Sequence, residues 1–115
     1  MNKPQINASQ EEMINVDIED AKLAIARYEA LLRLFDNKDF EEVILKDYIE
    51  HESTRLTMAL ADPNPALNRN NLLEQLLAIS NFNQYLITVQ RTGYEMKQRM
   101  DEFLKTRDEI IEEGE

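Results

Sequence analysis

The chain has 115 residues, of which 43% are hydrophobic and 31% charged, and its net charge is −10. This length fits one domain with a modest core, and the composition argues against wholesale disorder. The absence of cysteine excludes disulfides and thiol chemistry. No apolar run approaches the roughly 20 residues that span a bilayer, and residues 1–10 lack the apolar core of a signal peptide. We therefore expect a protein that is soluble and intracellular or packed inside an assembly, that is not secreted by a signal peptide, and that makes no membrane contact.

The first predicted element follows a flexible N-terminal arm over residues 1–11. Ser9 and Glu12 have the spacing of a capping box, which favours a helix start at this point. A helix over about residues 12–36 is predicted by apolar residues that alternate four and three positions apart, as in the a/d stripe of a coiled coil. This stripe consists of Ile14, Ile18, Ala21, Ile25, Tyr28, Leu32 and Phe35.

A second helix is predicted over about residues 39–61. Asp39 is a suitable N-cap, and the acidic residues that follow it suit the positive end of a helix dipole. Pro63 ends the helix, because the residue before a proline is displaced from the helical region. One face of this helix is marked by Phe40, Val43, Ile44 and Tyr48.

The third predicted helix, over about residues 70–112, is much longer than the other two. From Asn71 to Glu113 the chain has no proline and a single glycine, Gly93. A straight helix of about 42 residues would be roughly 63 Å long. It either kinks at Gly93 and folds back as a fourth helix, or continues and outruns its neighbours, and we favour continuation. A distal stripe would then need a cover, for which a second copy is the obvious candidate. The distal stripe consists of Met96, Met100, Phe103, Ile110 and Ile111.

The sequence offers little for catalysis or for ligand binding. His51 is the single histidine, and a metal site needs three or four convergent ligands. Ser53 lies two residues beyond His51, a spacing that points the two side chains apart on a helix. The small basic group of Arg91, Lys97 and Arg99 is a poor footprint for nucleic acid. We therefore predict no catalytic residue, no metal and no cofactor, and no direct binding of nucleic acid or of a small-molecule substrate.

Part of the chain resembles a group of viral proteins. The segments Tyr28–Phe40, Ile44–Tyr48, Glu52–Arg55 and Ala61–Pro63 are similar to small, acidic, helical proteins of tailed bacteriophages. The resemblance spans roughly residues 20–90 and carries no catalytic residue. It implies a phage origin, a role in virion assembly or host interaction, and a location in the host cytoplasm or within the virus particle.

These observations together predict an all-α fold in a single helical domain over residues 12–113. A helical hairpin over residues 12–61 packs on the long C-terminal helix in a coiled-coil-like manner, and the chain forms oligomers. We expect a non-enzymatic interaction or assembly protein, such as a virion-structure, scaffold-like or adaptor component. Its partners would be itself and another protein, bound through the distal stripe.

The alternative is a small acidic inhibitor that binds a host enzyme or a nucleic-acid-binding protein. Its surface would be the acidic residues of the second helix together with the acidic tail, residues 101–115. The 13 basic residues interspersed in the chain speak against strong mimicry of nucleic acid. The acidic residues in question are Asp39, Glu41, Glu42, Asp47, Glu50 and Glu52.

Overall fold

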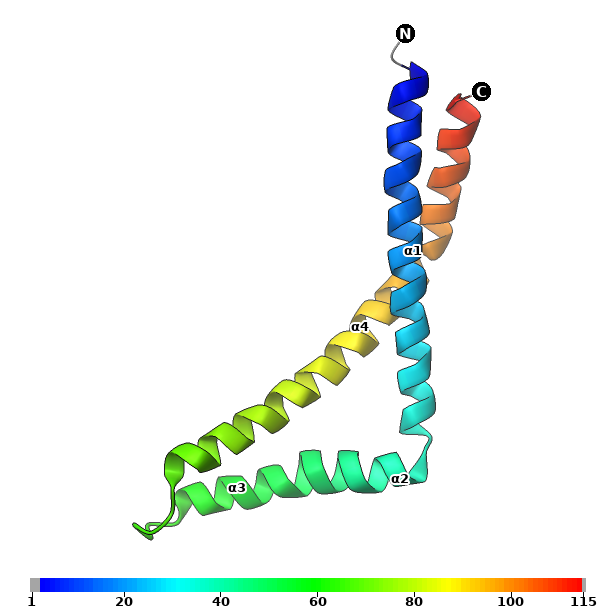
Figure 1. Cartoon of the computed structure of the whole chain (residues 1–115). Helices are drawn as coiled ribbons and strands as arrows, with labels where there is room; N and C mark the ends of the chain where they lie inside the picture. The colour runs from blue at the N-terminus through cyan, green and yellow to red at the C-terminus, as the bar shows by residue number, and fades with distance from the viewer. Residues whose placement is uncertain (1–2, 115) are drawn as a thin grey trace. The chain divides into compact units, whose positions relative to one another are not determined.

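The computed structural model describes residues 3–114, with side chains from Ser9 onward, and within these residues the chain is helical and has no strand (Figure 1). The prediction of an all-helical fold that packs on a long C-terminal helix is confirmed. The second predicted helix is a continuous helical segment made of three elements. The elements in chain order are α1 (Lys3–Phe35), α2 (Lys38–Phe40), η1 (Glu41–His51), α3 (Glu52–Ala61) and α4 (Arg69–Gly114).

The described residues gather into two compact units. In unit 1, the part of α1 up to Glu29 lies beside the part of α4 from Val89 onward (Figure 1). Unit 2 runs from Ala30 to Thr88 and holds the end of α1, the segment from α2 to α3, and the first half of α4. Both long helices therefore contribute to two separate cores.

The structure differs from the prediction at the N-terminus. Helix α1 begins at Lys3, so residues 3–11 are helical where an arm was expected, while Met1 and Asn2 lie outside the described residues. Pro4 is compatible with this start, because backbone nitrogens of the first turn have no acceptor within the helix. The capping-box spacing of Ser9 and Glu12 consequently falls inside a helix.

The turn between α1 and α2 is fixed by an asparagine. The Asn37 side-chain oxygen accepts a hydrogen bond from the backbone N–H of Phe40 at 3.0 Å. This is the N-cap geometry, so the cap is Asn37 and not the predicted Asp39, which lies in the first turn. The Phe35 and Phe40 rings lie 6.3 Å apart across the turn.

The loop between α3 and α4 is also held by polar side chains. Helix α3 ends at Ala61, as the position of Pro63 predicts. The Asn68 side chain accepts from the backbone N–H of Asn71 at 3.0 Å and caps α4. The Arg69 guanidinium donates to backbone carbonyl oxygens at the end of α3 and in the loop. These bonds tie the start of α4 to the end of α3.

The middle of the second helix winds more widely than an α-helix. Element η1 is a π-helix, whose turns hold more residues than the 3.6 of an α-helix. Partly buried apolar residues lie four positions apart at Phe40, Ile44 and Tyr48, and the fully buried Leu56 follows eight positions later. The face that carries Tyr48 packs on α4, where the Tyr48 and Phe82 rings meet edge-on with centroids 6.0 Å apart.

Each unit has a small buried core. Unit 1 buries Ile14, Ile18 and Ala21 of α1. In unit 2 the buried hydrophobic residues come from three helices, and Leu56 of α3 is completely inaccessible to solvent. The others in unit 2 are Leu31 of α1 and Ile79 and Leu86 of α4.

Replacing Leu56 tests the core of unit 2. Leu56→Ala removes a fully buried side chain and is expected to lower the free energy of unfolding by about 2–5 kcal/mol. Met58→Ala is the matched control, because Met58 lies two residues further along α3 with 70% of its surface exposed. Denaturant titration followed by circular dichroism measures both. Equal effects of the two variants would contradict this packing.

Candidate interaction surface

Helices α1 and α4 come into close contact in unit 1 at Gly93, which is buried. A Cβ atom built on Gly93 would overlap the Cβ of Tyr28 and lie 2.8 Å from the carbonyl oxygen of Ala24. Only glycine lacks this atom, so here the backbone of α4 lies directly against α1. The Tyr28 and Tyr94 rings pack edge-on beside it, with centroids 6.5 Å apart. Helix α4 runs unbroken through Gly93, as the favoured prediction stated.

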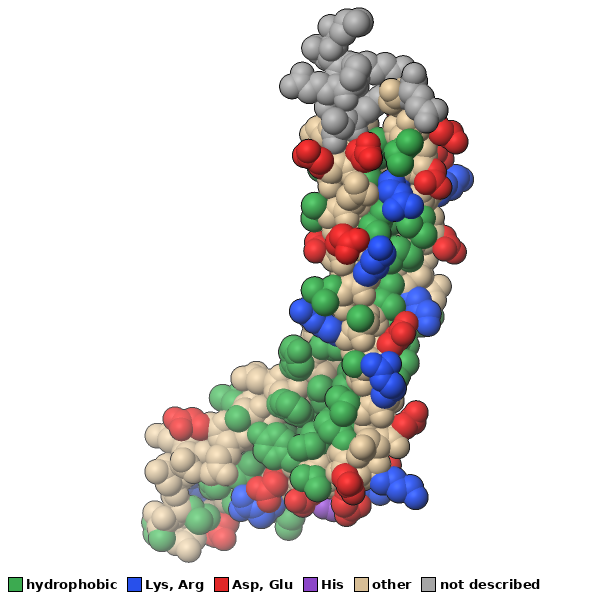
Figure 2. Space-filling view, turned by 45° about the vertical axis from the view of Figure 1, so that its right-hand side comes forward, with side chains coloured by type: hydrophobic (Ala, Val, Ile, Leu, Met, Phe, Trp, Pro, Cys, Tyr) green, Lys and Arg blue, Asp and Glu red, His purple; other side chains and the backbone are tan. Residues whose placement is uncertain are grey.

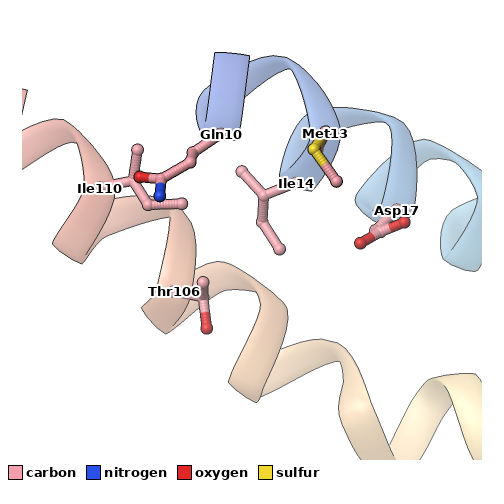
Figure 3. Close-up of a pocket in the computed structure, with 6 residues that line it drawn as sticks. All are labelled: Gln10, Met13, Ile14, Asp17, Thr106 and Ile110. Atoms are coloured by element: carbon pink, nitrogen blue, oxygen red, sulfur yellow. The ribbon is translucent and has the colours of Figure 1, made fainter. Parts of the chain in front are cut away.

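A shallow groove further along unit 1 shows that the two helices stay together. It has a volume of about 350 Å³, and Figure 3 shows side chains of both helices around it. Asp17 is the one ionisable group among the lining residues, so the groove lacks the convergent polar groups of a ligand site. The lining residues are Gln10, Met13, Ile14 and Asp17 of α1 and Thr106 and Ile110 of α4.

The distal stripe belongs to this helix pair. Its members Met96, Met100, Phe103 and Ile110 are partly buried within the single chain, while Ile111 is 40% exposed. Since α4 from Val89 onward shares unit 1 with α1, the same chain provides cover that was expected from a second copy. A role of these residues in partner binding stays a prediction.

A second apolar stripe, on α4 within unit 2, has no such cover. We call it the outer seam. Its members alternate four and three positions apart, the spacing of a coiled-coil seam, and all of them are exposed. The three apolar members have large exposed fractions of 47%, 61% and 40%, for Leu73, Leu77 and Ile87 respectively. The outer seam consists of Leu73, Leu77, Ser80, Gln84 and Ile87.

All members of the outer seam except Leu73 lie in a stretch of α4 without charge. Residues 75–90 contain no Asp, Glu, Lys or Arg. In a chain that is 31% charged, about five charges would be expected over this length. An exposed face of a soluble helix normally carries charged side chains. The combination of exposed leucine, isoleucine and no charge is typical of a surface that contacts another protein.

In the space-filling view, hydrophobic side chains form a broad area over unit 2, and charged side chains lie along its edge (Figure 2). Exposed apolar residues of unit 2 outside the outer seam include Leu34, Val43, Met58 and Tyr85.

The acidic residues on η1 and α3 are partly balanced by nearby cations. Arg55 donates two hydrogen bonds to Glu52, at 2.9 and 2.8 Å, and this lowers the pKa of the Glu52 carboxyl below its usual value. Lys46 lies 3.3 Å from Glu41. All of these groups are solvent-exposed or half-exposed, so the pairs add little to stability. They do reduce the negative potential of this surface.

The single histidine lies on η1 among acidic residues. His51 is exposed and lies 3.9 Å from Asp47 on the same helical segment. Among the described residues, no three His, Cys, Asp or Glu side chains gather in a way that could hold a metal ion. No described helix combines the length and the apolar character needed to cross a membrane.

The sequence analysis singled out the distal stripe as the face that needs a cover and did not single out the outer seam. Leu73, Leu77 and Ile87 are not among the residues for which the sequence predicted a contact. Two signals in the sequence could have revealed the outer seam. They are the alternating spacing from Leu73 to Ile87 and the absence of charge from residue 75 to residue 90.

Comparison of the chain with protein-family models, with curated proteins and with solved structures found no match.

Replacing Gly93 tests the helix contact of unit 1. Gly93→Ala gains about 1 kcal/mol of helix propensity, but its methyl group meets Tyr28 and Ala24, and such overpacking costs about 1–3 kcal/mol. We expect a net fall in the free energy of unfolding, measured by denaturant titration. Gln98→Ala, at an exposed position of α4, is the control and should have little effect. A stabilisation of about 1 kcal/mol by Gly93→Ala would show that α4 does not approach α1 here.

Replacing Phe103 tests whether the chain itself covers the distal stripe. Phe103→Glu places a charge on a partly buried position and is expected to lower the free energy of unfolding by about 2 kcal/mol. Gln98→Glu introduces the same charge at an exposed site of the same helix. Thermal unfolding and solution mass are measured together. A Phe103→Glu variant with the stability of the wild type but a lower solution mass would show that the distal stripe is a contact between copies.

Proposed function

We propose that this chain is a non-enzymatic assembly protein that associates with itself through the outer seam of α4. The observation that carries the proposal is the exposure of Leu77 and its apolar neighbours on a charge-free face. Exposed apolar area of this kind is costly in water and is covered when two chains associate. The face carries no charge by which a second copy would be repelled.

The setting of this assembly is proposed from the resemblance to small acidic phage proteins. A virion-structure, scaffold-like or adaptor component would use such a chain as a helical spacer that joins protein subunits. Self-association through one helix face leaves the other exposed apolar residues of unit 2, such as Val43 and Met58, for another protein. The partners would then be a second copy and a further protein of the particle.

The alternative of an acidic inhibitor has weaker support. Two of the six acidic residues that would form its surface, Glu41 and Glu52, have a lysine or an arginine within 3.3 Å. A surface that imitates nucleic acid needs a continuous negative potential, and these neighbours interrupt it.

Solution mass tests the proposal. Light scattering behind size exclusion, over a range of protein concentrations, is expected to give more than the 13.5 kDa of one chain. Leu77→Glu should weaken the association at least tenfold, because it replaces a buried leucine contact worth about 2 kcal/mol with a desolvated charge. Met58→Glu is the matched control, an equally apolar and exposed position on α3. A wild-type protein that stays monomeric would contradict the proposal.

A further inference from the structure

We infer that two copies pair their outer seams with the α4 helices antiparallel, about a two-fold axis that passes midway between Ser80 and Gln84. This inference rests on the proposed self-association and adds the orientation and the register of the two helices. Unit 2 presents the whole seam on one helix, over about 21 Å from Leu73 to Ile87 at 1.5 Å per residue.

The register follows from the order of residues along the seam. In the antiparallel pair, Leu77 of one copy faces Ile87 of the other, and Ser80 faces Gln84. Leucine against isoleucine is an apolar layer, and it occurs twice because of the two-fold axis. In the two central layers the small hydroxyl of Ser80 lies against the long amide of Gln84. The pair fills the space and allows a hydrogen bond between the two side chains. Polar residues at such positions fix the register of paired helices.

A parallel pair fits the same residues less well. It would place Ser80 opposite Ser80, which leaves space unfilled, and Gln84 opposite Gln84, which crowds two long amides into one layer. The antiparallel pair gives each layer one small and one large polar side chain. The packing of the seam therefore selects the antiparallel orientation.

The charges at the ends of the stretch favour the same orientation. Glu74 precedes the charge-free stretch, and Arg91 follows it, one turn beyond Ile87 in the unbroken α4. In this antiparallel register Arg91 of each copy lies opposite Leu73 of the other copy and next to its Glu74. Parallel helices instead place like charges opposite one another, which is unfavourable. The seam is thus complementary to itself in charge as well as in shape.

Engineered cysteines test the inference, because the wild-type chain has none. The single variants Leu77→Cys and Ile87→Cys are purified, mixed in equal amounts and mildly oxidised. In the antiparallel pair residue 77 faces residue 87 of the second copy, so the mixture is expected to form a mixed disulfide dimer. Either variant alone should form little, because its two cysteines would lie about 15 Å apart along the helices. A disulfide needs Cα atoms roughly 4.4–6.8 Å apart.

The controls separate this inference from the proposed function. Met58→Cys measures random collision at an exposed position outside the seam, and circular dichroism confirms that each variant is folded. Disulfides within the unmixed variants would show a parallel pair and overturn the inference, while leaving self-association intact. A dimeric mass with no disulfide above the Met58→Cys background would place the interface elsewhere and also overturn it. A monomeric wild-type protein would overturn the inference and the proposed function together.

Discussion

The contact of Gly93 with Ala24 and Tyr28 fixes how the two long helices of unit 1 pair. It sets an antiparallel register in which Ile14 and Ile110 both reach the groove further along the pair. From the Gly93 contact to the groove, α1 runs about 14 residues (Tyr28 back to Ile14) and α4 runs about 17 (Gly93 to Ile110). These correspond to similar lengths of about 21 and 25 Å. A bulky residue at position 93 would hold the helices apart and uncover both stripes. The distal stripe of unit 1 is therefore largely covered within the chain, whereas the outer seam of unit 2 is exposed.

Much of the fold could be predicted from the sequence because it depends on local signals. The alternating spacing of apolar residues located the helices, and Pro63 placed the end of α3. The start of α1 was missed because no residue before Ser9 carries a hydrophobic period. The cap was placed at Asp39 and not at Asn37 because both residues are good N-caps, and only the backbone geometry separates them. The π-helical turns of η1 leave no local signal beyond a spacing of four.

The candidate site could be predicted only in part, since it depends on which stripe the chain covers by itself. Gly93 stood out as a possible hinge, but its contact with Tyr28 joins residues far apart in the sequence. The distal stripe was recognised as a face that needs a cover, and α1 of the same chain lies in its unit. The outer seam was overlooked because Leu73 and Leu77 border the core face of α4. Its charge-free character becomes informative once the structure shows the seam to be exposed. Each copy has a net charge of −10, so two copies repel each other at long range. Residues 75–90 carry no charged side chain that would repel a second copy at close range.

The central claim is that α1 of the same chain covers the distal stripe, whereas the outer seam is covered by a second chain. Amide hydrogen exchange at several protein concentrations tests both parts at once, because association protects only the amides that it stabilises. We predict that exchange slows with rising concentration over residues 73–87 of α4 and stays constant over residues 96–110. The reverse pattern, with protection that rises with concentration over residues 96–110 alone, would contradict the account and show that the distal stripe is the contact between copies.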